Sequence, residues 1–242
     1  MFLCVKLKSV ILFSITLFLL LLTLFFINFS NNEQDAALSV FDEQMPMVLV
    51  IDPGHGGEDG GAVSKEGTLE SQINLDISRR IAALAGFTGT ACVLTRESNE
   101  IDYPAEAKTV ARRKAYDLKA RAKLINATDG GVLISVHQNH FTHSSPHGPQ
   151  VFYATTEGSN ELGSQVQLAL NTALLPENRR LASPVAKNIY LFKHVSCPAV
   201  LAECGFLSNP LEAKLLATES YRLKISFALI CAFFQYSSND KI

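Results

Sequence analysis

The stretch MVLVIDPGHGG, residues 47–57, decides the fold. Its apolar first half predicts a buried β-strand, and its second half places His55 in a glycine-lined turn directly after that strand. A second apolar run, GVLISV at residues 131–136, ends in another histidine, His137. In α/β proteins, ligands bind where parallel strands end at one edge of the sheet, so we expect the two histidines to lie together there. Paired histidines at such an edge indicate a metal site.

Strand-like and helix-like segments alternate along the rest of the chain. The expected strands cover residues 47–52, 90–95, 131–136, 150–154, 188–193 and 198–203. The expected helices cover residues 69–86, 107–127, 158–175, 209–217 and 219–235. This alternation predicts an α/β fold: a single domain with an open, mostly parallel twisted sheet of about six strands and helices on both faces. We place this domain at residues 47–236, followed by a C-terminal tail at 237–242.

The N-terminal segment requires a separate interpretation. Residues 9–29 carry no charge and are long enough to cross a hydrocarbon core of about 30 Å as a transmembrane helix. Lys6 and Lys8 precede this span and acidic residues follow it, so the positive-inside rule predicts that the following domain is exported. We therefore predict a membrane anchor at residues 1–29 and a linker at 30–46. A cleaved signal sequence is the alternative, although no good cleavage site abuts the span. The domain is then expected on the extracytoplasmic side of the cell membrane, or secreted after cleavage.

Composition excludes some classes of partner. The chain of 242 residues has a net charge of −2 and no long basic run, so we expect no nucleic-acid partner. Its five cysteines form no CxxC pair, and an odd number cannot pair completely within one chain. Buried free thiols are therefore expected.

The identity of a third metal ligand is open between two glutamates. A zinc hydrolase typically keeps three protein ligands and leaves the fourth position to water. Glu58 forms the H-x-x-E spacing of metallocarboxypeptidases with His55, but it lies in a turn-rich stretch where acidic residues are commonly solvated. Glu70 falls in the first turn of the helix expected at 69–86, where the backbone fixes its direction.

Several further polar residues have both a functional and a structural interpretation. Glu203 ends the strand-like run at 198–203, so its carboxylate either faces the site or caps the following helix. Asp117 and Arg121 are four residues apart on a predicted helix, and an exposed pair of this kind contributes only about 0.2–0.5 kcal/mol. Three loop histidines either lie over the pocket as polar residues or contact a substrate or a second metal: His140, His143 and His147.

Four segments together resemble the signatures of zinc-dependent N-acetylmuramoyl-L-alanine amidases of the amidase-3 type. They are IDPGHGG at 51–57, Glu70, SVHQN at 135–139 and PAVLAECGFLSN at 198–209, in the family's order. The resemblance implies a Zn²⁺ ion bound by His55, Glu70 and His137, with Glu203 as the catalytic carboxylate. It favours Glu70 over Glu58 as the third ligand. His140 departs from the family pattern, which usually has a small residue there.

The same resemblance implies a substrate. Members of the family hydrolyse the amide bond between N-acetylmuramic acid and the L-alanine of the stem peptide in peptidoglycan. QVFY at 150–153, NIYLFKH at 188–194 and the N-terminal span without a wall-binding repeat are similar to the germination-specific branch, which acts in spore cortex on the way to muramic-δ-lactam. The implied partners are peptidoglycan and, through the N-terminal helix, the membrane, with no protein partner assigned. Two alternatives remain: a metallocarboxypeptidase using His55, Glu58 and His137, and a non-catalytic cell-wall-binding protein.

Overall fold

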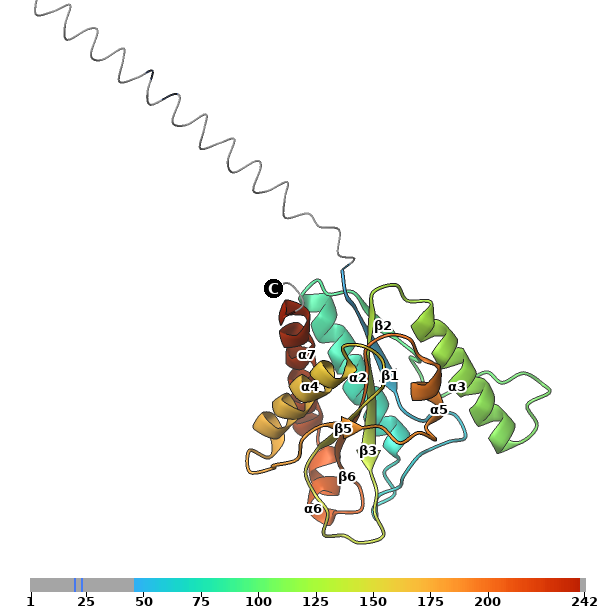
Figure 1. The fold of residues 1–242 in the computed structure, drawn as a ribbon. Helices are drawn as coiled ribbons and strands as arrows, with labels where there is room; N and C mark the ends of the chain where they lie inside the picture. The colour runs from blue at the N-terminus through green and yellow to red at the C-terminus, as the bar shows by residue number, and fades with distance from the viewer. Residues whose placement is uncertain (1–19, 21–22, 24–45, 240–242) are drawn as a thin grey trace, which may run out of the picture. The chain divides into compact units, whose positions relative to one another are not determined.

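The computed structural model describes residues 20, 23 and 46–239 of the chain, and Figure 1 shows the fold of 46–239. Its elements in chain order are β1 (Val48–Pro53), α2 (Glu70–Phe87), β2 (Cys92–Leu94), α3 (Val110–Asn126), β3 (Gly131–Asn139), β4 (Gln150–Tyr153), α4 (Ser159–Leu174), β5 (Ser183–Pro184), α5 (Tyr190–His194), β6 (Ala199–Phe206), α6 (Pro210–Leu216) and α7 (Glu219–Asn239). Apart from Leu20, Thr23 and Pro46, the anchor and linker predicted at 1–46 lie outside the described residues. Within the described part of the chain, no helix is both long and apolar enough to cross a membrane.

The domain has one six-stranded mixed sheet with the strand order β2-β1-β3-β6-β4-β5. The first four strands in this order run parallel to one another. β4 pairs antiparallel with β6, and β5 pairs parallel with β4. The predicted single α/β domain is confirmed, and the parallel part of the sheet contains the strands that end at both histidine motifs.

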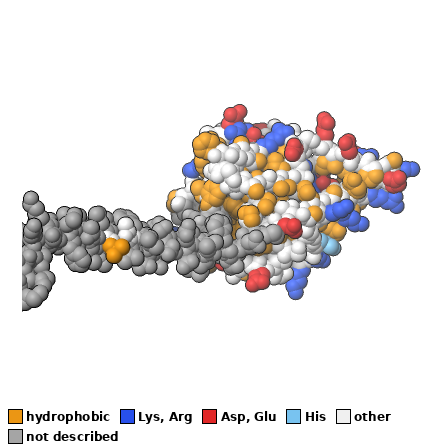
Figure 2. Space-filling view, turned by 90° about the horizontal axis from the view of Figure 1, so that it is seen from above, with side chains coloured by type: hydrophobic (Ala, Val, Ile, Leu, Met, Phe, Trp, Pro, Cys, Tyr) orange, Lys and Arg blue, Asp and Glu red, His pale blue; other side chains and the backbone are white. Residues whose placement is uncertain are grey.

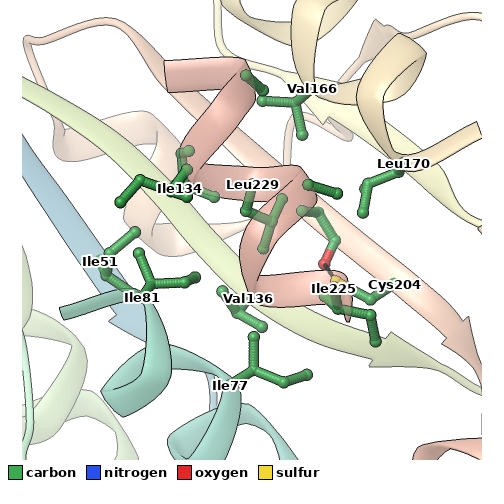
Figure 3. Close-up of a cluster of buried hydrophobic side chains, with 14 of the residues drawn as sticks. Ile51, Ile77, Ile81, Ile134, Val136, Val166, Leu170, Cys204, Ile225 and Leu229 are labelled. Carbon is green, nitrogen blue, oxygen red and sulfur yellow. Dashed lines mark hydrogen bonds between the residues drawn. The ribbon is translucent and has the colours of Figure 1, made fainter. Parts of the chain in front are cut away.

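Helices cover both faces of the sheet, as Figure 1 shows. Successive residues of a strand point to opposite faces of the sheet. Leu49 and Ile51 belong to the hydrophobic core that includes side chains of α2, α4 and α7, whereas Val50 belongs to the core on the side of α3 and α5. Figure 3 shows the first of these cores, in which Ile134 and Val136 of β3 lie among side chains from α2 and α7. Burying one such side chain contributes about 1.5–3 kcal/mol to stability, so this packing fixes the sheet edge that carries the site.

The strand predicted at 188–193 is wrong, because this segment forms the short helix α5. A short apolar run is compatible with either a strand or a buried helix, and here Leu191 and Phe192 are buried beside α3 and the sheet. Asn126 at the end of α3 fixes the segment: its side-chain amide donates to the His194 carbonyl at 2.6 Å and its oxygen accepts from the Ser196 backbone N–H at 3.0 Å. The fifth strand is instead the two-residue β5.

Charged and hydrophobic side chains are mixed on the visible surface of the domain, and its described cysteines form no disulfides. Figure 2 shows basic and acidic side chains interspersed on the visible face, with hydrophobic side chains among them. The four cysteines of the described part are free, as predicted, but their expected burial holds fully only for Cys204. Cys92 and Cys197 are half-buried and Cys231 is exposed on α7.

Candidate metal site and active-site pocket

The loop after β1 holds His55 in an unusual backbone conformation. Its φ of 62° is the only positive value of a non-glycine residue in the described part of the chain, so surrounding contacts must maintain it. Gly54 allows this loop to approach β3, because a Cβ atom there would lie 2.2 Å from the His137 ring. The sequence DPGHGG therefore brings the first histidine against the second.

Glu70 is the first residue of α2 and is almost completely buried. One carboxylate oxygen, Oε2, accepts from the Ala62 backbone N–H at 2.9 Å, and the other, Oε1, accepts from the Gln138 N–H at 3.0 Å. The positive end of the helix dipole also favours a carboxylate at this position. The side chain is therefore fixed as an anion before any ligand binds.

The structure brings His55, Glu70 and His137 together. His55 Nε2 lies 3.3 Å from Glu70 Oε2, and His137 Nδ1 lies 3.0 Å from Glu70 Oε1. One candidate ligand atom from each residue lies within 4.8 Å of the others. Zinc in proteins is typically bound by imidazole nitrogens and carboxylate oxygens, so two histidines and a carboxylate this close together offer a donor set that fits such an ion. Glu58 is not part of this group, because it is exposed and pairs with Arg113 of α3.

The charges of the site fit a divalent cation. Burial lowers the pKa of His55, but Asp59 and Glu70 outweigh this effect and raise it to about 9. Asp59 Oδ1 lies 3.0 Å from His55 Nδ1, and its other oxygen lies 2.7 Å from Lys114 Nζ. Burial raises the pKa of Glu70, but the two histidines outweigh it and hold this pKa well below the usual range. A metal ion and a proton would compete for His55 between these carboxylates, so metal binding would weaken in acid.

Glu203 lies beside this group on the neighbouring strand. The register of β3 and β6 places it directly opposite His137. Its Oε2 is buried without a hydrogen-bond partner among the described residues. Burial raises its pKa to about 7, the range in which a carboxyl group can both accept and return a proton near neutral pH. The helix-cap alternative is wrong, because Asn209 caps α6 by accepting from the Leu211 and Glu212 N–H groups at 3.0 and 3.2 Å.

A pocket of about 410 Å³ opens over these residues. Its floor is the edge of the sheet, with His55, His137 and Glu203, and its walls come from α3 and from the α5 segment. Lys114 contributes a half-exposed ammonium to the α3 wall. The three loop histidines are exposed and lie outside the described lining of this pocket: His140, His143 and His147.

Arg121 makes buried contacts that the sequence did not predict. It is buried, and besides Asp117 it contacts Asp52 at 2.9 Å and donates to the backbone carbonyls of Pro53 and His55 at 2.7 Å. Burial raises the pKa of Asp52, but the Arg121 guanidinium and two hydroxyl donors outweigh it and lower the pKa to about 2. Arg121 thus ties the His55 loop to α3. The one available sequence signal was Asp52, a carboxylate at the end of a buried strand that needs a partner.

Replacing Arg121 by Met is expected to lower the free energy of unfolding by about 3–5 kcal/mol, because it leaves the Asp52 carboxylate buried without its counter-charge. Urea denaturation followed by circular dichroism measures the change. Arg112→Met, on the exposed side of the same helix, is the matched control and should change stability by less than about 0.5 kcal/mol. Equal stability of the two variants would show that the Arg121 contacts do not support the fold.

Comparison with known proteins decides the family. A profile of N-acetylmuramoyl-L-alanine amidases, Amidase_3, matches residues 49–232, from β1 into α7. The chain belongs to this amidase family. The germination-specific N-acetylmuramoyl-L-alanine amidase of Bacillus subtilis (strain 168) is 35% identical over 223 residues, which cover 90% of this chain and 91% of that protein.

Solved structures agree with this assignment. The CwlD amidase from Clostridioides difficile, solved in complex with the GerS lipoprotein, matches with a TM-score of 0.76 and 36% identity, covering 79% of this chain and 98% of that one. An N-acetylmuramoyl-L-alanine amidase from Clostridium difficile 630 matches with a TM-score of 0.68 and 27% identity, covering 79% and 96%. The whole pocket of the present amidase lies within the region that the family profile matches.

Proposed function

We propose that this amidase hydrolyses the amide bond between the lactyl group of N-acetylmuramic acid and the L-alanine of the stem peptide in peptidoglycan. The proposal assigns zinc binding to His55, Glu70 and His137 and proton transfer to Glu203. The observation that carries it is the unpartnered Glu203 Oε2, which is buried beside the His-Glu-His group in one pocket of the described domain.

Amide hydrolysis requires an activated water and a protonated leaving amine. A bound zinc ion would polarise the scissile carbonyl and lower the pKa of a water molecule. Glu203 accepts the proton of the attacking water and delivers it to the nitrogen as the C–N bond breaks. Its raised pKa supports both steps, because the carboxyl group can hold the proton between them.

The two alternatives are less well supported. A metallocarboxypeptidase of the H-x-x-E type would need Glu58 as a ligand, but this side chain pairs with Arg113 at the surface. A wall-binding protein without catalysis would gain nothing from a buried carboxylate without a partner, which costs stability.

The setting of the reaction is part of the proposal. Similarity to the germination-specific enzyme of Bacillus subtilis and to CwlD supports a substrate in spore cortex. A role before muramic-δ-lactam formation is part of the same proposal. We also propose that residues 1–29 anchor the domain to the membrane, or are cleaved after export, with the domain on the extracytoplasmic side. GerS belongs to the CwlD structure, and we assign no protein partner to this chain. Parallel digestion of purified cortex and vegetative wall tests the setting, with faster release of stem peptides expected from cortex.

Removal of metal provides a direct test of the zinc assignment. Dialysis against a chelator is expected to stop the release of stem peptides from peptidoglycan, and added Zn²⁺ is expected to restore it. Mg²⁺ is the control and should not restore activity, because it prefers oxygen ligands to imidazole. Full activity of a protein shown by elemental analysis to be free of zinc would contradict the assignment.

A further inference from the structure

We infer that Asn74 is a positioning residue that holds the three proposed metal ligands in one arrangement. The inference rests on the proposed zinc site. Asn74 lies on α2, one helical turn after Glu70, and its side chain is completely buried. A buried amide at this position needs partners for its donors and its acceptor, and the structure provides them from three separate segments.

Each ligand segment contacts the same amide group. Asn74 Nδ2 donates to Glu70 Oε1 at 3.3 Å and to the Gly54 carbonyl, just before His55, at 3.2 Å. Asn74 Oδ1 accepts from Gln138 Nε2, just after His137, at 3.1 Å. One side chain therefore bonds to Glu70 itself and to the immediate neighbours of His55 and His137.

This arrangement requires an amide. Two N–H donors and one acceptor on a planar group match the two carbonyl or carboxylate oxygens and the one N–H that face it. An aspartate would keep the acceptor for Gln138 but place oxygen against the oxygens of Glu70 and Gly54. Partners of this kind behind metal ligands orient them, and their mutation typically lowers metal affinity by about 10–100-fold.

Two neighbours on α2 serve as matched controls. Ser78 lies one turn further along the helix and is equally buried, but its hydroxyl has no hydrogen-bond partner among the described residues. Ile81 is a fully buried core residue of the same helix, shown in Figure 3. Ile81→Ala destabilises the fold by leaving a cavity without touching a ligand. These controls separate a loss of stability from a loss of ligand positioning.

The test measures Zn²⁺ affinity of the folded full-length protein by competition with a chromogenic chelator, with thermal unfolding of the zinc-free protein recorded in parallel. Asn74→Asp is expected to bind zinc about 10–100-fold more weakly than the parent protein. Ser78→Ala and Ile81→Ala are expected to keep the parent affinity, even where the second unfolds at a lower temperature.

A folded Asn74→Asp protein with the parent affinity for zinc would overturn the inference. If Asn74→Asp does not fold, Gln138→Met replaces it, because this change removes the bond to Asn74 Oδ1 while keeping the buried volume similar. Weaker zinc binding by Gln138→Met then supports the inference, and the parent affinity overturns it. A parent protein that binds no zinc would instead contradict the proposed metal site itself.

Discussion

Replacing Glu203 by Gln is expected to lower kcat by roughly 10²–10⁴-fold, the usual contribution of a general acid–base group, while the protein still binds zinc. Glutamine has nearly the same shape but cannot take a proton from water and return it to an amine. Because the Glu203 carboxylate is buried without a partner for Oε2, the neutral amide should leave the free energy of unfolding unchanged or higher. Peptide release from peptidoglycan, zinc content and urea denaturation measure the three quantities.

Glu58→Gln is the matched control for this experiment. Glu58 is a carboxylate of the His55 loop, but it is exposed and paired with Arg113, and surface pairs contribute little. Its replacement should change kcat by less than about twofold. Parent-like turnover by Glu203→Gln, or loss of turnover in Glu58→Gln, would contradict the assigned roles, and the second result would favour the metallocarboxypeptidase alternative.

Replacing Glu70 by Gln is expected to weaken zinc binding by more than about 100-fold, beyond the effect of outer residues, and to abolish turnover with it. The change removes the negative charge that faces both histidines. It also turns one oxygen into an N–H₂ group that faces the backbone N–H of Ala62 or Gln138, which costs about 1–3 kcal/mol. Zinc titration and thermal unfolding record the two effects separately.

Asp76→Asn provides the control on the same helix. Asp76 pairs with Arg80 and Arg222 outside the pocket, so its loss should leave zinc affinity unchanged. Zinc binding by Glu70→Gln at the strength of the parent protein would remove Glu70 from the ligand set.

Local sequence patterns correctly predicted the strands and the helix that carry the proposed metal ligands. The apolar runs before His55 and His137 form the parallel strands β1 and β3, and the helix expected to start near Glu70 does so. Neighbouring parallel strands end at one edge of the sheet, so these two runs predict that their histidines lie together. The strand predicted at 188–193 was wrong because a short apolar run is compatible with both a strand and a buried helix.

The supporting contacts could not be predicted because they join distant parts of the chain. Arg121 and Asp117 suggested an ordinary surface pair, and only the fold brings Asp52 to the same guanidinium, 69 residues away in sequence. Asn74 had no signal of its own, since its partners come from the loop after β1 and from β3. Sequence patterns therefore predicted the strands that carry the two histidines, and the family resemblance implied roles for Glu70 and Glu203, but neither predicted the buried polar groups that hold these residues.

Analysis of the reaction products tests the central claim most directly. Purified, zinc-loaded enzyme is incubated with peptidoglycan from spore cortex and from vegetative wall, and the soluble products are separated and identified by mass spectrometry with amino-terminal labelling. The account predicts stem peptides that begin with a free L-alanine amino group, and glycan chains whose muramic acid has lost its peptide. Release of a single carboxy-terminal amino acid, or of no product at all, would contradict it.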